Sequence, residues 1–265
     1  MATTRVGIGG WDYAPWRATF YPDTIPQKRQ LEYASRQFSS IEINSTFYRN
    51  ARPEHYASWH AQTPDDFLFA VKANRYTTHR KELGEAGESV ERFLGSGLSE
   101  LGDKLGPILW QLAATKHYDP DDLAAFFKLL PARLGKRRLR HVLDARHDSF
   151  LCAGYLQLAR RHHVATVFTD APQFPAFADI TGDLIYARLM NARSTIATGY
   201  TRPALKKWAA AAQQWQAGQL PELPGRPYVT SGKVSARERD VFVYFINGAK
   251  ERAPAAATRL IDLLQ

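Results

Sequence analysis

One cysteine occurs among the 265 residues, so an internal disulfide is excluded. A chain of this size without a disulfide suits a reducing compartment. The cysteine, Cys152, lies in the segment SFLCAGYLQLA, which indicates a small core side chain on a helix. A reactive thiol is the less favoured interpretation, because no partner cysteine is present.

Long hydrophobic runs are also absent. No stretch of about 18 apolar residues occurs, which excludes a transmembrane helix. The first residues, MATTRVGIGGWDY, lack the apolar segment of a signal peptide. We therefore expect a cytoplasmic protein with no membrane partner. The HExxH, CxxC, GxSxG and Walker motifs are missing as well, so no short motif specifies the chemistry.

Acidic residues are scarce relative to basic ones: 26 Asp and Glu stand against 35 Lys and Arg, giving a formal net charge of +9 and an isoelectric point near 9.6. A positive field of this size favours anionic partners, either nucleic acid or phosphorylated metabolites. The alternative is a solubility feature spread over the surface. Basic clusters at Arg133–His141 and Arg160–His163 lie where a helix leads into a strand, which favours a solvated rim over a binding stripe.

Eight short apolar segments have the length of strands, and most are separated by helical patterns. The predicted strands are Val6–Gly10, Ser40–Asn44, Phe67–Lys72, Ile108–Leu112, His141–Arg146, Ala165–Asp170, Leu184–Leu189 and Val241–Asn247. Helical patterns cover residues 28–38, 53–61, 120–130, 149–162, 202–216 and 254–264.

Strands that alternate with helices indicate parallel βαβ units, and eight of them in about 250 residues are typical of a TIM (β/α)8 barrel. A doubly wound α/β sheet is the alternative. The segment APQFPAFADITG after the sixth strand is broken by prolines, so we expect a degenerate helix there. No linker, low-complexity segment or short repeat divides the chain, which predicts one domain over residues 1–265.

Polar residues gather at the ends of these apolar segments. In SSIEINSTFYRN, Glu42 and Asn44 alternate with isoleucines, so the two polar side chains share one face of a strand. Positions near the carboxyl ends of barrel strands form the active-site floor of such enzymes. The residues at these positions are Glu42, Asn44, Lys72, Gln111, Asp144, Arg146, Asp170, Arg188 and Asn247. Because unpaired buried charges are costly, we expect them to converge, either as a ligand site, which we favour, or as a structural ion-pair network.

Loop residues are expected around this floor. Trp11 and Tyr48 offer stacking surfaces for a ligand, and packing of the loops over the mouth is an equal alternative. His79 and His147 each follow a strand end closely, either as proton-transfer groups or as hydrogen-bonded loop residues. A divalent metal held by the floor carboxylates and these histidines stays chemically open, with zinc or manganese suited to such ligands. The spacing gives a metal no specific support, and we predict no cofactor.

Six segments together resemble one known family. They are GIGGWDYAPWRATFYP, FSSIEINSTFYRN, FLFAVKANRYTTH, LGPILWQL, DARHDSF and VFVYFING, and they follow in the family's order over nearly the whole chain. The resemblance is to the YecE-like family, also called domain of unknown function 72. It implies a TIM barrel, supplies no activity, and implies the mouth residues Glu42, Asn44, Tyr48, Lys72, His79, Gln111, Arg146 and His147.

The chain departs from the family pattern at several strand ends. The departures are Ala113-Ala114 in place of two prolines, Asp144-Ala145-Arg146 in place of Glu-Phe-Arg, Met190-Asn191 in place of His-Gly, and Asn247 alone in place of two asparagines. A divergent member is indicated, with an altered substrate or with lost chemistry.

Three functions remain open. The first is an enzyme, a hydrolase, lyase or isomerase, that acts on a small anionic substrate, phosphorylated or sugar-like, at the carboxyl-end mouth. Glu42 and Asp144 would be its acid/base carboxylates, and Lys72, Arg146 and Arg188 would hold the anion. The second is nucleic-acid binding, or processing of the kind done by endonuclease IV, to which such barrels are similar in shape. The third is a non-catalytic metabolite-binding protein. The sequence indicates no oligomeric state.

Overall fold

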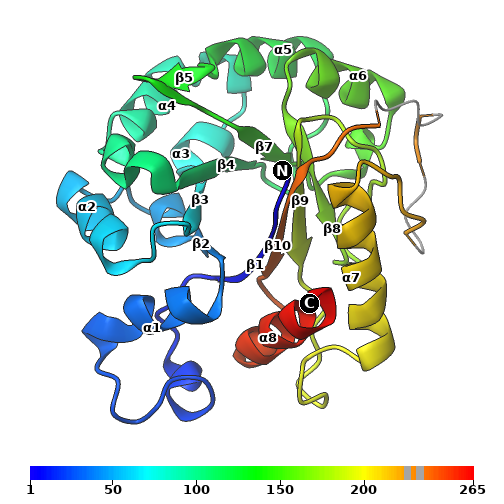
Figure 1. Cartoon of the computed structure of the whole chain (residues 1–265). Coiled ribbons are helices and arrows are strands. Elements are labelled where there is room, and N and C mark those ends of the chain that lie inside the picture. The colour runs from blue at the N-terminus through cyan, green and yellow to red at the C-terminus, as the bar shows by residue number, and fades with distance from the viewer. Residues whose placement is uncertain (224–227, 231–235) are drawn as a thin grey trace.

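The computed structural model describes residues 1–223, 228–230 and 236–265. Eight parallel strands close into a barrel in the order β1-β10-β9-β8-β7-β4-β3-β2 (Figure 1). Their bounds are β1 Thr4–Gly9, β2 Ser40–Ile43, β3 Leu68–Lys72, β4 Leu105–Gln111, β7 His141–Asp144, β8 Ala165–Thr169, β9 Leu184–Leu189 and β10 Asp240–Phe245. The TIM-barrel prediction is confirmed, and all eight predicted strands are present with small shifts at their ends.

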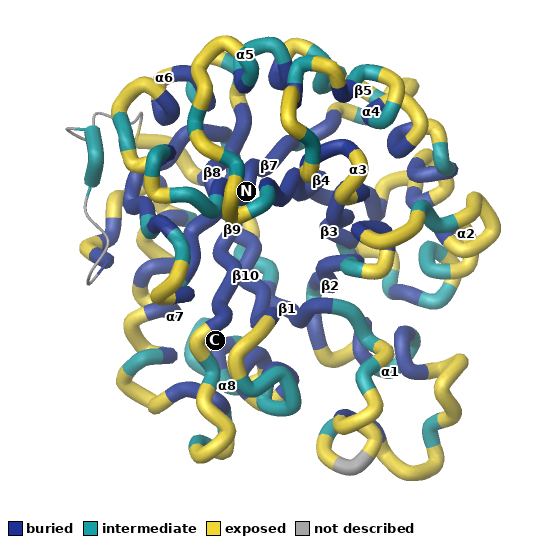
Figure 2. The backbone as a smooth tube through the Cα atoms, turned by 180° about the vertical axis from the view of Figure 1, so that it is seen from behind, coloured by how far each residue is buried: buried dark blue, intermediate teal, exposed yellow. Residues whose placement is uncertain are grey.

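Helices cover the outside of the barrel, so the strands are buried at the centre and the exposed positions lie on the outer helices and on the loops (Figure 2). The helices are α1 Gln30–Gln37, α2 Pro53–Gln62, α3 Arg75–Thr78, α4 Gly87–Leu94, α5 Pro120–Leu129, α6 Ala153–Arg161, α7 Arg202–Gln216 and α8 Ala253–Leu264. None of the helices in the described ranges is long and apolar enough to cross a membrane.

The connection between β8 and β9 contains no helix, in agreement with the prediction from its prolines. Its conformation is fixed by a buried carboxylate instead. Asp179 is 1% exposed and accepts hydrogen bonds from the backbone N–H of Val229 at 2.7 Å and of Thr230 at 3.0 Å. A charged acceptor therefore stabilises a segment that proline keeps from being helical.

Other connections differ from the predicted pattern. The basic segment before β7 forms a short antiparallel hairpin, β5 Arg133–Leu134 and β6 Arg137–Arg138, with Gly135 at a positive φ of 57° in its turn. The short helices α3 and α4 were not predicted. The helix expected from Ser149 begins at Ala153, because Ser149 lies in a separate short 3-10 helix, Asp148–Phe150, where its hydroxyl accepts the N–H of the distant Tyr118 at 2.7 Å. Cys152 therefore precedes the helix, and its half-buried side chain packs against the core.

The barrel lumen is a packed core and not a pore, as is usual for this fold. Tyr186 and Tyr244 fill it with ring centroids 5.1 Å apart, and the Tyr244 hydroxyl is 2.6 Å from Ser40 Oγ. A Cβ atom at Gly7 would lie 1.7 Å from the carbonyl oxygen of Ser40. Glycine is therefore required where β1 approaches β2.

Alternation along β2 sorts its side chains between two environments. Ile41 and Ile43 are at most 1% exposed and belong to the core between barrel and helices. Glu42 lies between them in sequence and points into the lumen, where it meets the side chain of Arg188. The period-2 geometry of the strand thus places a carboxylate at the carboxyl end of the lumen.

Candidate active site at the barrel mouth

Arg188, near the carboxyl end of β9, is the centre of a polar layer above the lumen aromatics. It is 1% exposed and reaches three other strands. Nε and Nη2 donate to Oε2 and Oε1 of Glu42, both at 3.0 Å. Nη1 donates to Asp144 Oδ2 at 2.7 Å and to Gln111 Oε1 at 3.2 Å. The structure therefore brings Glu42, Gln111, Asp144 and Arg188 together.

Glu42 uses both of its oxygens. Besides the two bonds from Arg188, Oε2 accepts the hydroxyl of Tyr186 at 2.7 Å and Oε1 accepts Nδ2 of Asn44 at 2.9 Å. Burial by itself would raise the pKa of Glu42, but the charge and hydrogen bonds of Arg188 outweigh it and hold the pKa below its ordinary value. Glu42 is thus an ionised group locked in place by four donors.

Asp144, the last residue of β7, accepts hydrogen bonds from described residues through one of its two carboxylate oxygens. Its Oδ2 accepts Nη1 of Arg188 and, at 3.1 and 3.0 Å, Nε and Nη2 of Arg146. Its Oδ1 has no hydrogen bond to any described residue. The Arg146 guanidinium also lies 4.3 Å from the centroid of the Phe174 ring. Two guanidinium groups therefore fix the orientation of Asp144 and leave one carboxylate oxygen available.

Lys72, the last residue of β3, is 8% exposed. Its Nζ lies 3.8 Å from the centroid of the Phe47 ring and makes no hydrogen bond or ion pair within the described ranges. Burial and the charges of Arg188 and Arg146 lower the pKa of Lys72 to about 7, although Glu42 and Asp144 partly oppose this. Lys72 is therefore a buried amine that is partly neutral near neutral pH.

His79 packs edge-on against the same phenylalanine, with its ring centroid 5.2 Å from that of Phe47. Partial burial and the positive charges of Lys72 and Arg146 lower the pKa of His79. A neutral imidazole beside a partly neutral amine is able to accept a proton at neutral pH.

Four polar atoms of this floor have no hydrogen-bond partner in the part of the chain that the structure describes. They are Lys72 Nζ, Gln111 Nε2, Asp144 Oδ1 and Arg146 Nη1. None of them is among the fully enclosed unpaired atoms, so each keeps contact with solvent. Their residues come from the neighbouring strands β3, β4 and β7 and the loop after β7. Three donors and one acceptor with unused capacity thus lie along one arc of the mouth.

A pocket of about 350 Å³ lies above the carboxyl ends of β1 and β2 and includes Asn44, which binds Glu42. Its size suits a small molecule. Lys250, in the loop after β10, lines the pocket with Nζ 4.8 Å from the Tyr13 ring centroid. Burial lowers the pKa of Lys250, which Glu42 opposes. Sequence reasoning missed Lys250, and its place after the last barrel strand is the signal that would have found it.

The remaining loop residues have varied settings. Trp11 lines the pocket but also packs edge-on against Trp59, with ring centroids 5.2 Å apart. Tyr48 is 65% exposed and also lines the pocket. Asn247 is exposed after β10.

His147 uses Nδ1 to accept the N–H of Ser149 at 3.1 Å, and its ring lies 3.7 Å from that of His117 between centroids. This contact orients the imidazole at the end of β7. His117 is exposed and was not singled out from the sequence.

Asp170 follows β8 and binds the chain after β9. Its Oδ1 accepts the N–H of Met190 at 2.6 Å and its Oδ2 accepts the hydroxyl of Tyr200 at 2.7 Å. The Met190 side chain is 6% exposed and belongs to the apolar lumen cluster. An apolar side chain therefore occupies the position at which the family resemblance implied a histidine.

Metal ligands do not gather at this floor. Within the described ranges, no group of three or more His, Cys, Asp or Glu side chains is placed to hold a metal ion. Glu42 and Asp144, the two floor carboxylates, both bind the guanidinium of Arg188. A cation therefore already occupies the space between these two carboxylates.

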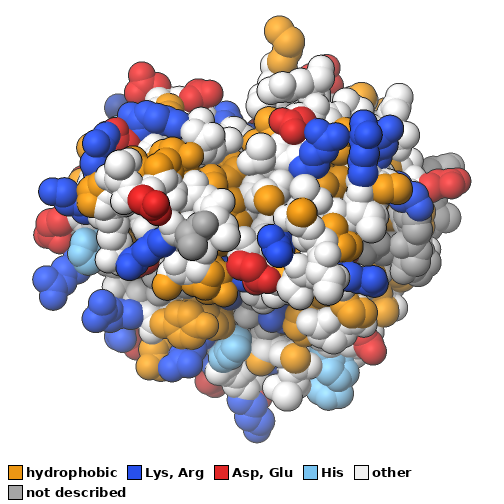
Figure 3. Space-filling view, turned by 90° about the horizontal axis from the view of Figure 1, so that it is seen from below, with side chains coloured by type: hydrophobic (Ala, Val, Ile, Leu, Met, Phe, Trp, Pro, Cys, Tyr) orange, Lys and Arg blue, Asp and Glu red, His pale blue; other side chains and the backbone are white. Residues whose placement is uncertain are grey.

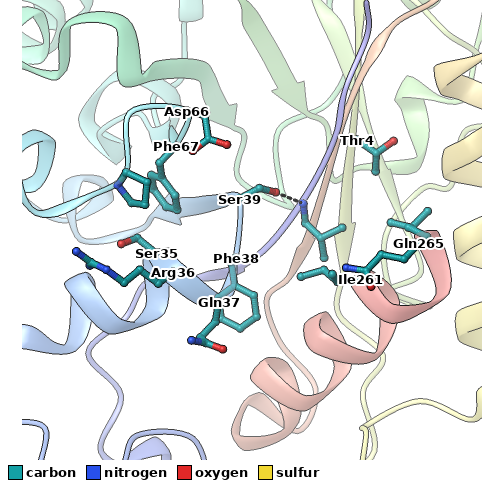
Figure 4. A pocket seen from close by; sticks show the side chains of 13 residues that line it. Thr4, Ser35, Arg36, Gln37, Phe38, Ser39, Asp66, Phe67, Ile261 and Gln265 are labelled. Atoms are coloured by element: carbon teal, nitrogen blue, oxygen red, sulfur yellow. Dashed lines mark hydrogen bonds between the residues drawn. The ribbon is translucent and has the colours of Figure 1, made fainter.

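A larger pocket of about 510 Å³ lies at the opposite end of the barrel. It is lined by Thr4 of β1, Ser39 before β2, Phe67 before β3 and Ile261 of α8 (Figure 4). Thr4, Ser39 and Phe67 lie at the amino ends of their strands, and Ile261 lies in the last turn of α8. None of the predicted site residues lines this pocket, and the candidate site is therefore the smaller, charged mouth.

A closed (β/α)8 barrel with a buried charged layer at the carboxyl ends of its strands defines a TIM-barrel protein, with its polar residues where such proteins have their active sites. The model of the DUF72 family, described as a protein of unknown function, matches residues 5–265 of this sequence. The chain belongs to the DUF72 family, which confirms the resemblance seen in the sequence.

Similar proteins agree with this assignment. The chain is 28% identical over 149 residues to the UPF0759 protein YecE of Escherichia coli (strain K12), a match that covers 56% of this chain and 50% of that protein. The match thus spans half the length of this curated relative. A DUF72 family protein of Thermotoga maritima MSB8 has a similar structure, with a TM-score of 0.75 and 21% identity over 99% of both chains. One of Enterococcus faecalis V583 has a TM-score of 0.70 and 16% identity over 100% of this chain and 98% of that chain.

Proposed function

We propose that the protein is an enzyme that acts on a small anionic substrate, phosphorylated or sugar-like, at the carboxyl-end mouth of the barrel. The observation that carries the proposal is the set of four solvent-reachable polar atoms, on Lys72, Gln111, Asp144 and Arg146, that have no hydrogen-bond partner among the described residues. In a purely structural ion-pair network, each donor and acceptor would have a protein partner, because unsatisfied buried polar groups cost stability. The single cysteine suits a cytoplasmic location, which is part of this proposal.

The charge of the floor favours an anion. Three cationic side chains, Lys72, Arg146 and Arg188, stand against two carboxylates, Glu42 and Asp144, so the layer carries an excess of one positive charge when Lys72 is protonated. Arg146 has a free N–H edge beside its bond to Asp144, and arginine binds phosphate and carboxylate groups well through such an edge.

The two carboxylates have different roles in this proposal. Glu42 is fixed by four donors and positions Arg188. Asp144 has a free Oδ1 and is the acid/base group, with His79 as a second proton acceptor near Lys72. His147 lies in the loop that follows β7, three residues after Asp144, and is a third candidate. Proton transfer of this kind serves a hydrolase, a lyase or an isomerase.

Binding of an anion tests the first part of the proposal. Calorimetric titration with inorganic phosphate and with a panel of sugar phosphates is expected to give saturable binding to the native protein. Arg146→Met removes hydrogen bonds to a charged ligand, worth about 1.5–3 kcal/mol, so the dissociation constant is expected to rise roughly tenfold to a hundredfold. Arg259→Met, which changes a surface arginine on α8, serves as the matched control. Absence of binding by every anion, or equal weakening in the control, contradicts the proposal.

Turnover tests the second part. Products from the panel are followed by nuclear magnetic resonance, and Asp144→Asn is expected to abolish turnover while phosphate binding persists, because the free Oδ1 is replaced by an amide that does not accept a proton. Saturable binding without any conversion in the native protein would instead favour the non-catalytic metabolite-binding alternative.

A second candidate, nucleic-acid binding, is favoured by one surface feature. Tyr48 and Tyr76 are 65% and 68% exposed, and the Arg75 guanidinium lies 5.9 and 5.7 Å from their ring centroids. Exposed aromatic rings beside arginine are able to stack bases. Figure 3, in contrast, shows a face on which Lys and Arg side chains are interspersed with acidic and apolar ones and form no continuous stripe.

Fluorescence anisotropy with a labelled single-stranded oligonucleotide tests this candidate. It predicts binding at low ionic strength that weakens steeply with added salt and is reduced in a Tyr48→Ala and Tyr76→Ala double variant. Absence of binding at low ionic strength contradicts it.

A further inference from the structure

The described part of the chain buries two lysines and satisfies only one of them. Lys104 is 3% exposed, and its Nζ donates to the carbonyl oxygens of His60 and Thr63, both at 2.7 Å. Lys72 is 8% exposed, and its Nζ faces an aromatic ring and makes no hydrogen bond to a described residue. The fold therefore gives the buried ammonium group of Lys104 hydrogen-bond acceptors, whereas the ammonium group of Lys72 at the barrel mouth has none among the described residues.

The surroundings of Lys72 explain why its ammonium lacks a partner. Both nearby carboxylates, Glu42 and Asp144, are bound by Arg188, and Asp144 is bound by Arg146 as well. The two guanidinium groups disfavour the protonated form of the amine, and burial beside Phe47 leaves Lys72 only 8% exposed to water. His79, the remaining titratable group at this ring, shares the positive environment. Lysines that are desolvated or lie next to other cations are activated as nucleophiles.

We propose that Lys72 is a catalytic nucleophile that forms an imine with the carbonyl carbon of a small anionic aldehyde or ketone. The inference rests on the proposed function and narrows its substrate class. The lone pair of the neutral amine forms the N–C bond while the C=O π electrons move to oxygen. A proton passes from nitrogen to that oxygen and gives a carbinolamine. A second proton, taken from solvent by way of Asp144, passes to the hydroxyl, which leaves as water while nitrogen forms the C=N bond. The sum is amine plus carbonyl plus one proton giving protonated imine plus water, with no oxidant or reductant.

Neighbouring groups are placed for these transfers. Oδ1 of Asp144 is free to relay the protons. Nη1 of Arg146 and Nε2 of Gln111 are free to bind the anionic group and the carbonyl oxygen. These residues lie on β4, on β7 and just after β7, beside the strand that ends in Lys72. A protonated imine withdraws electrons from the adjacent carbon, so this step serves a lyase or an isomerase.

Reductive trapping tests the proposal. The native protein is incubated with dihydroxyacetone phosphate or with glyoxylate, and sodium cyanoborohydride is added to convert an imine into a stable amine. Peptide mass mapping is expected to find the adduct at Lys72 and to find none there in Lys72→Met. Lys207→Met, which changes an exposed lysine on α7, is the matched control and is expected to trap as the native protein does. Trapping spread evenly over surface lysines, or unchanged in Lys72→Met, overturns the proposal.

The pH dependence separates a nucleophile from a lysine that only packs on Phe47. The trapping rate is expected to rise with pH around a midpoint near 7. In Arg146→Met, which loses a neighbouring cation, the midpoint is expected to move to higher pH. A profile that rises only near the ordinary lysine pKa overturns the proposal.

Binding of glycerol 3-phosphate, an anion without a carbonyl group, separates failure of this inference from failure of the proposed function. If it binds in an Arg146-dependent manner while no carbonyl compound traps Lys72, the imine proposal is wrong and the anion site stands. If no anion binds at all, both are wrong.

Discussion

Arg188 and Glu42 form a two-pronged ion pair across the barrel, with Nε and Nη2 each 3.0 Å from a different carboxylate oxygen. Both side chains are at most 2% exposed. The same guanidinium uses its third nitrogen to bind Asp144. One cation thus compensates two buried anions that come from β2 and β7, on opposite sides of β9 in the closed sheet.

Arg188→Met is expected to destabilise the fold strongly. It leaves Glu42 and Asp144 buried with fewer partners, and breaking a buried pair costs about 3–5 kcal/mol. Urea unfolding followed by circular dichroism measures the loss. Arg259→Met breaks a surface pair with Asp262 and is expected to cost about 0–1 kcal/mol. Similar small losses in both variants would show that the buried layer contributes no more than a surface pair.

Lys72→Met is expected to stabilise the fold, in the direction opposite to Arg188→Met. The pKa of Lys72 is lowered to about 7 in the folded chain from its ordinary value of 10.5, so between these values the unfolded chain binds more protons and stability rises with pH. The penalty is therefore complete below pH 7 and fades as the pH rises towards 10.5. Methionine removes it.

Urea unfolding at several pH values tests this. We expect Lys72→Met to be more stable than the native protein by about 1–4 kcal/mol at pH 6, with the difference shrinking towards pH 9. A variant that is less stable than the native protein at pH 6 contradicts the prediction and points to a structural cation–π contact with Phe47.

His141 is expected to make the protein sensitive to mild acid. Trp110 Nε1 donates to its Nδ1 at 3.1 Å, so the ring proton lies on Nε2, which is 2.8 Å from the carbonyl oxygen of Pro131. Burial lowers the pKa of His141 below its ordinary value of 6.5, although the Pro131 acceptor opposes this. Below pH 6.5 the unfolded chain therefore binds more protons, and stability falls as the pH is lowered through this range.

His141→Gln removes the titrating group. The decrease in unfolding free energy between pH 7 and pH 5 is expected to be smaller in this variant than in the native protein. An unchanged pH slope would assign the acid sensitivity to other groups.

Gly7→Ala is expected to prevent folding. The added Cβ would meet the Ser40 carbonyl oxygen at 1.7 Å, which separates β1 from β2 and breaks barrel closure. A loss above about 4 kcal/mol is expected, in the range of exceptional single substitutions. Gly10→Ala is the control: a Cβ there meets nothing within 4 Å, and only its φ of +76° is strained, at about 1–2 kcal/mol. Both variants are compared by thermal unfolding, and a folded, stable Gly7→Ala contradicts the argument.

The strands, and the face of the strand on which each side chain lies, could be predicted from the sequence because both depend on local periodicity. The alternation of Ile41 and Ile43 with Glu42 placed the carboxylate in the lumen, and the structure agrees. Tyr186 was missed, although it lies two residues before Arg188 and therefore on the same face. The hairpin of β5 and β6 was also missed, because two-residue strands carry too little pattern.

The hydrogen-bond and ion-pair partners of each charged side chain could not be predicted from the sequence, because they depend on contacts between strands far apart in the chain. Asp170 and Arg188 both end barrel strands in the sequence, yet Asp170 binds Met190 N–H and Tyr200 while Arg188 joins Glu42 and Asp144. No local pattern distinguishes these outcomes.

A parallel (β/α)8 barrel with polar residues at the carboxyl ends of its strands could be predicted from the sequence, because strand length, alternation and helix spacing are properties of consecutive residues. The hydrogen-bond partners of these groups depend on tertiary contacts: Glu42 accepts four hydrogen bonds, whereas among the described residues Asp144 Oδ1 and the Lys72 ammonium beside Phe47 have no hydrogen-bond partner. The reason is that contacts between distant strands pair Arg188 and Arg146 with the two carboxylates, and Lys72 forms no ion pair with either of them.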